Sequence, residues 1–113
     1  MIQAAILEEV REVMMLYSPT VRFVYRESGE RSEWSPYMIT PSRGHVEIKS
    51  AGPRPIAEVE ALELDPIIVR PRGARQEPER EDLLNVISQA LHERGVPFHV
   101  VDGLIRIELA KPD

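Results

Sequence analysis

The chain has 113 residues and a formal net charge of −5, and 42% of its residues are hydrophobic. This length and composition predict a single domain spanning residues 1–113, and they exclude a disordered or membrane-spanning chain. The sequence contains no cysteine, which excludes disulfides, thiolate metal sites and cysteine nucleophiles, while its acidic balance disfavours general nucleic-acid binding.

The beginning of the chain and its residue usage predict a cytoplasmic bacterial protein. Acidic residues closely follow "MIQAAIL", whereas a secretory signal has a basic start and a longer apolar run. The basic residues comprise 12 Arg and only 2 Lys, and side-chain amides are few. Few amides and many prolines are typical of thermophilic proteins, so a thermophilic source is one interpretation.

The first forty residues predict a helix followed by a hairpin. Apolar side chains recur every three or four residues from 2 to 17, which indicates one buried helical face. Ser18 and Pro19 end this helix, because proline disfavours helical geometry in the residue before it. The elements expected next are a strand at 20–27, a turn at 28–29 and an edge strand at 30–40 interrupted at Pro36.

The middle of the chain predicts one clear strand between less regular segments. Residues 45–50 alternate apolar and polar side chains after a turn at 41–44, which is typical of a half-buried strand. Residues 51–55 contain a glycine and two prolines, and we expect them to be irregular. Residues 56–65 fit either a helical turn or a bulged strand, and the β-branched run at 67–69 favours a strand.

The last third predicts a connector, a helix and a second hairpin. Residues 70–82 are polar, so we expect a connector that runs into a helix near Pro78, with acidic side chains in its first turn. Gly95 is expected to end this helix in a left-handed conformation. Asp102-Gly103 predicts a two-residue turn between strands at 98–101 and 104–109.

Together these elements predict an α+β fold, a two-layer α/β sandwich. Two helices pack on one face of a mainly antiparallel sheet of about five or six strands, in the order α-β-β-β-(β)-α-β-β. Residues 2–37 and 79–110 share an apolar pattern at an offset of 77 positions, which indicates a weak internal pseudo-repeat. The alternative is that two unrelated helix–hairpin units obey the same burial rules.

The sheet face that carries no helix is the first candidate site. Alternation places charged side chains and valines there, a mixed surface that can meet water or a second copy. Trp34 is the sole tryptophan and is expected in the core or in a dimer contact. The residues assigned to this open face or to a dimer contact are Arg22, Arg26, Trp34, His99 and Arg106.

An arginine cluster is the second candidate site. Arg70, Arg72 and Arg75 surround Gly73, and guanidinium groups can grip a phosphate or a carboxylate with paired donors. Acidic residues follow directly and oppose this hypothesis, because they neutralise the local field.

A histidine–glutamate pair is the third candidate. His45 and Glu47 lie two apart on a strand and therefore share one face, as an acid–base pair or part of a metal site requires. A zinc site needs a third protein ligand, which His99 would have to supply. The sequence contains no complete catalytic set, and it predicts no cofactor and no metal.

The function predicted from these observations is binding. We expect a small non-enzymatic protein that self-associates as a homodimer and binds a protein or a small-molecule partner. One alternative is nucleic-acid or anion binding through arginines of the open face or of the 70–75 loop. Another is a small enzyme that uses His45 and Glu47.

Overall fold

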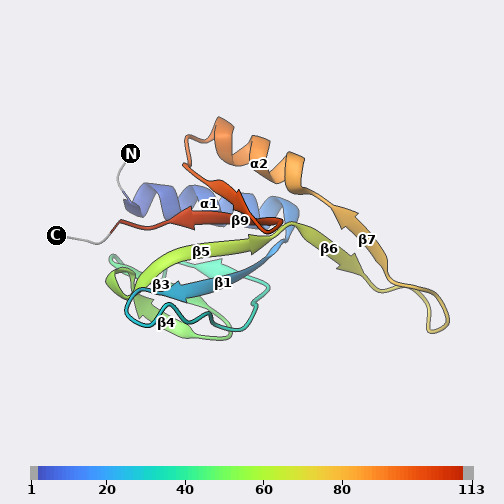
Figure 1. Ribbon diagram of the computed structural model, residues 1–113, viewed down its shortest axis with the longest axis horizontal. Helices are drawn as coiled ribbons and strands as arrows, with labels where there is room; N and C mark the ends of the chain where they lie inside the picture. Colours follow the sequence, from blue (N-terminus) through green and yellow to red (C-terminus); the bar gives the residue numbers. More distant parts are fainter. Residues whose placement is uncertain (1–2, 111–113) are drawn as a thin grey trace.

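The chain begins with helix α1 (Gln3–Tyr17) in the computed structural model, which describes residues 3–110 (Figure 1). Leu7, Val10 and Val13 recur at helical spacing and are buried in the core. The helix ends at Ser18, whose N–H donates to the carbonyl of Met14 at 2.8 Å. The predicted helix is confirmed over this span, while position 2 lies outside the described residues.

A four-stranded antiparallel sheet forms the centre of the fold. Its strand order is β1-β5-β9-β8, so β5 lies between the first strand of the chain and the last. One face carries apolar side chains such as Phe23, Leu62 and Ile107, which pack in one core with the buried faces of both helices. The strands are β1 (Thr20–Tyr25), β5 (Val59–Asp65), β8 (His99–Val101) and β9 (Leu104–Glu108).

A second sheet of three short strands closes another side of the same core. Its order is β2-β3-β4, and Met38, Val46 and Ile48 are buried. The strands are β2 (Met38–Ile39), β3 (His45–Ile48) and β4 (Gly52–Pro55). The prediction that residues 51–55 are irregular is therefore wrong for 52–55. The prolines are accommodated because β4 is an edge strand, where a missing N–H costs no ladder bond.

Both structures considered for residues 56–65 occur, one after the other. A 3-10 turn, η1 (Ile56–Glu58), leads into β5 at Val59. Val59, Leu62 and Leu64 of β5 enter the core, and a bulge where β5 pairs with the end of β1 interrupts the alternation between Val59 and Leu62.

The segment expected as a connector is instead a hairpin. Strands β6 (Ile67–Arg70) and β7 (Glu79–Asp82) pair with each other and project from the rest of the molecule (Figure 1). The predicted helix start near Pro78 is wrong, because α2 (Leu84–Glu93) begins only after β7, and its first N–H donates to Asp82 Oδ1 at 2.9 Å. We refer to residues 67–82 as the arm.

The end of the chain follows the sequence prediction closely. Gly95 has a φ of 72° and ends α2, since its N–H donates to the carbonyl of His92 at 3.1 Å. Asp102 and Gly103 have φ values of 53° and 79°, as a tight turn between β8 and β9 requires.

The α+β class is confirmed, whereas the strand count is not. Within residues 3–110, two helices and the strands of two antiparallel sheets share one core, but nine strands form three sheets instead of five or six forming one. The difference arises because residues 38–55 pair among themselves and the arm pairs only with itself among the described residues. No helix within residues 3–110 is long and apolar enough to cross a membrane. The pseudo-repeat stays a prediction.

Candidate ligand-binding site

The face of the central sheet opposite the core carries one row of charged side chains. The strand registers align Arg22 of β1 with Glu63 of β5, Glu63 with Arg106 of β9, and Arg106 with His99 of β8. Three of these four residues are ones that the sequence assigned to the open face. Glu63 is the residue that sequence reasoning missed.

Glu63 is the centre of this row. Its side chain is buried, with 2% of the residue exposed, and Oε1 accepts hydrogen bonds from Arg22 Nε at 2.8 Å and Arg31 Nε at 2.9 Å. Arg106 Nη1 donates to Oε2 at 3.4 Å. Burial raises the pKa of the Glu63 carboxyl, but the hydrogen bonds and charges of Arg31 and Arg22 outweigh burial and bring the pKa below its ordinary value.

The outer members of the row are paired as well. Arg106 also donates to Glu108 at 2.6 Å and to Glu60 at 3.1 Å, and His99 Nε2 lies 3.7 Å from Glu108. The bond to Glu108 and the surrounding carboxylates raise the pKa of Arg106. The arginines of this face are thus already engaged by carboxylates, and an anion would have to displace them.

Trp34 lies on this same face, outside the core. It is half-buried, and the Arg22 guanidinium carbon lies 4.3 Å from its ring centroid. The expectation of a core position is therefore wrong, and a dimer contact stays a prediction. The ring reaches this position because residues 31–35 run beside β1 through bridges at Arg31 and Ser35.

The other predicted sites do not assemble. Arg70 pairs with Glu81 at 2.6 Å and Arg72 with Glu79 at 3.9 Å across the arm, while Arg75 lies exposed in its loop. Carboxylates across the arm thus engage Arg70 and Arg72, and an anion would have to displace them.

The predicted metal or acid–base set is also divided between two sheets. His45 belongs to β3, where Nδ1 lies 3.1 Å from Ser42 Oγ, whereas His99 belongs to β8 beside Glu108. Glu47 is on β3 with His45, so the His45–Glu47 pair and His99 lie in different sheets. No three His, Asp or Glu side chains within residues 3–110 are grouped to hold a metal ion.

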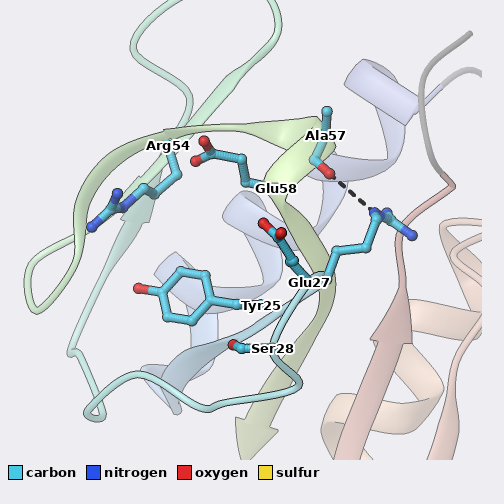
Figure 2. A pocket seen from close by; sticks show the side chains of 7 residues that line it. Tyr25, Glu27, Ser28, Arg54, Ala57 and Glu58 are labelled. Carbon is cyan, nitrogen blue, oxygen red and sulfur yellow. Dashed lines mark hydrogen bonds between the residues drawn. The ribbon is translucent and has the colours of Figure 1, made fainter.

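A hollow of about 670 Å³ opens where β1 ends, and Figure 2 shows the side chains around it. This volume is in the range of small-molecule sites, roughly 300–1,000 Å³. Three separate parts of the chain form its walls: the turn after β1, strand β4 and the 3-10 turn η1. The lining residues are Tyr25, Arg26, Glu27, Ser28, Arg54, Ala57 and Glu58.

Arg26 fixes two of these walls, the turn after β1 and η1, to each other. Its Nε donates to the carbonyl of Ala57 at 3.0 Å, and its Nη2 donates to those of Val59 at 3.0 Å and Leu109 at 2.8 Å. Its own N–H donates to the carbonyl of Glu58 at 2.9 Å. The sequence placed Arg26 on the open face, but its guanidinium instead joins the turn after β1 to η1, to β5 and to the segment after β9.

The remaining side chains give the hollow mixed chemistry. Tyr25 packs edge-on against Phe23 in the core, with ring centroids 6.2 Å apart, and the Arg54 guanidinium carbon lies 5.8 Å from the Tyr25 centroid. Glu27 and Glu58 extend over the hollow beside the tyrosine (Figure 2). Neither carboxylate has a hydrogen-bond or ion-pair partner within residues 3–110, in contrast to the paired carboxylates of the sheet face.

Sequence reasoning did not find this hollow. Ser28 and Gly29 gave a local signal for the turn. Arg54, however, lay in a segment expected to be irregular, and Glu58 lay in one that fitted either a helical turn or a bulged strand. Comparisons with protein-family models, with curated proteins and with solved structures found no match.

Proposed function

We propose that this protein is a binding domain that takes a small organic cation in the hollow beside Tyr25. The observation that carries the proposal is the pair of unpartnered carboxylates, Glu27 and Glu58, held next to an aromatic ring over a concave surface. Elsewhere, on the sheet face, the carboxylates of Glu60, Glu63 and Glu108 are engaged by arginines.

The chemistry of the walls favours an ammonium or guanidinium group. Glu27 and Glu58 offer acceptors for its N–H groups, and the face of Tyr25 attracts a cation or covers an apolar stem. Arg54 stands on the other side of the ring and suits a carboxylate at the far end of the ligand. A molecule with an amino group at one end and a carboxylate at the other fits both walls.

The fixed geometry of the hollow supports binding without rearrangement. Arg26 ties the turn after β1 to η1, to β5 and to the segment after β9 through four hydrogen bonds, and Tyr25 packs against the core. Little conformational entropy is then lost on binding, which favours affinity. Self-association as a homodimer and a cytoplasmic location remain parts of the proposal.

NMR titration of the ¹⁵N-labelled chain tests the proposal. The probes are L-arginine, L-lysine and n-butylamine, with sodium butyrate as the counterpart that lacks the cationic group. We expect the amines to shift the amide signals of residues 25–28 and 54–58 in a saturable way. Because the cation–π contribution of an exposed site is about 0.5–1 kcal/mol, Tyr25→Leu should weaken amine binding roughly two- to fivefold.

Matched carboxylate variants give the control. Glu27→Gln and Glu58→Gln remove a charge from the hollow, whereas Glu47→Gln removes one from β3, away from it. The first two variants should each weaken binding and the third should not. Equal shifts from butyrate and butylamine, or equal affinities for all three variants, would contradict the proposed site.

A further inference from the structure

The arm contributes no residue to the core. From Ile67 to Asp82 no side chain is buried, and β6 and β7 pair with no other described strand. The molecule measures 52 Å along its longest axis against 28 and 25 Å along the others, and the arm extends along the long axis (Figure 1). An isolated two-stranded hairpin is only marginally stable in water, so an additional strand would stabilise it.

The two outer edges of the arm differ in character. Strand β7 reads Glu-Arg-Glu-Asp, and charged side chains of this kind protect an edge against pairing. Strand β6 begins with the β-branched run Ile67, Ile68 and Val69, and Val69 is 47% exposed. The β6 edge is therefore the edge suited to receive a strand.

In an antiparallel ladder, hydrogen-bonded and non-bonded residue pairs alternate, and this alternation determines which backbone groups of β6 point to its outer edge. The Leu83 N–H donates to the Pro66 carbonyl at 3.0 Å, so bonded pairs recur at 68/81 and 70/79 of the antiparallel ladder. The backbone groups of Ile67 and Val69 then turn to the outer edge. The Ile67 N–H is already taken by Asp65 Oδ1 at 3.0 Å, and Pro71 has no N–H. Val69 is the position whose N–H and carbonyl both remain available.

We infer that β6 pairs antiparallel with β6 of a second copy, with Val69 opposite Val69 on the two-fold axis. This register forms a four-stranded sheet, β7-β6-β6-β7, across two molecules and leaves the bond to Asp65 intact. It places Ile67, Val69 and Pro71 of both copies in one apolar strip, because these residues share a face of the sheet.

A second copy fits this edge because its Val69 offers the same free N–H and carbonyl across a two-fold axis, and the charge of the arm does not oppose this pairing. The chain has a net charge of −5, but the arm carries four arginines and four acidic residues and is neutral. Two copies, each with a net negative charge, can thus contact each other through arms that carry no net charge. The arm also keeps them separated by more than the Debye length of about 8 Å at physiological ionic strength.

Sedimentation equilibrium of the full chain, from about 1 to about 500 μM, tests the inference. We expect a reversible dimer. Val69→Pro removes the outward N–H without removing a β6–β7 bond, and it should weaken the dimer at least about tenfold while the circular dichroism stays unchanged. Val69→Thr keeps the N–H and should dimerise within about threefold of the parent chain.

Cysteine cross-linking checks the register, because the chain has no cysteine of its own. Facing Cα atoms of a bonded pair lie about 5.5 Å apart, so Val69→Cys should form a disulfide between copies. Arg80→Cys would place its Cα atoms three strand spacings apart, about 14 Å, and should not. A chain that stays monomeric at every concentration, or a Val69→Pro variant that dimerises like the parent, would overturn the inference. Neither result bears on the hollow beside Tyr25.

Discussion

Replacing Glu63 by glutamine tests whether the charged row stabilises the central sheet. The substitution keeps the size and shape of the side chain but removes the negative charge that Arg22 and Arg31 contact at 2.8 and 2.9 Å. A hydrogen bond to a charged group contributes about 1.5–3 kcal/mol and a neutral one about 0.5–1.5 kcal/mol. Losing the charge from two such bonds should therefore lower the free energy of unfolding by about 2 kcal/mol. For a chain of this length that corresponds to a Tm lower by about 8 °C.

The pH dependence separates this charge effect from a change in packing. The folded-state pKa of Glu63 lies below its unfolded value, so its stabilising contribution is fully present above the unfolded pKa of about 4.3 and is lost as the pH falls through the folded pKa. Glu63→Gln has no such group. The difference in stability between the two chains should therefore be largest near neutral pH and shrink below about pH 4.

Urea unfolding measured by circular dichroism and by Trp34 fluorescence provides the assay. Trp34 is suited to it because its ring lies beside Arg22, within the row. Glu30→Gln is the control, since Glu30 is exposed and carries no ion pair within residues 3–110, and it should change stability by less than about 0.5 kcal/mol. A Glu63→Gln chain as stable as the parent at pH 7, or a difference equal at pH 3 and pH 7, would refute the reasoning.

Two further substitutions test other parts of the fold. Arg26→Gln should destabilise the chain by about 2–3 kcal/mol, because a neutral amide cannot replace the guanidinium bonds to three carbonyls, and thermal unfolding would measure the loss. A stability within about 0.5 kcal/mol of the parent would show that these bonds do not hold the hollow together. Gly95→Ala should cost about 1–2 kcal/mol, because the φ of 72° is strained for a residue with a Cβ, and an unchanged urea midpoint would contradict this explanation.

Local signals predicted the ends of the chain well. The apolar spacing of α1, Gly95 after α2 and the Asp102-Gly103 turn each act within a few residues, and each is found as expected. Long-range pairing was harder to predict. Glu79 and Glu81 resemble the first turn of a helix, yet they pair with arginines across the arm. The reason is that the chain reverses after β6 and forms β7 against it before α2 begins.

The sequence predicted those parts of the candidate sites that depend only on the alternation of side chains along a single strand. Arg22, Arg106 and His99 fall in one row because each is on the same side of its own strand. Glu63 required the strand assignment of residues 56–65, which the sequence left open. The hollow beside Tyr25 combines residues from the turn after β1, from β4 and from η1, and no local pattern reports how such segments meet.

The strand order also determines when this protein can fold during synthesis. Because β5 lies between β1 and β9, the central sheet is incomplete until residues 104–108 have been made. At about 5–20 residues per second, β9 follows η1 by roughly 2–10 s. During that interval Val21 and Phe23 lack the residues of β9 that complete the core around them, so the nascent chain presents apolar surface to chaperones. The core can close only after β9 has been made.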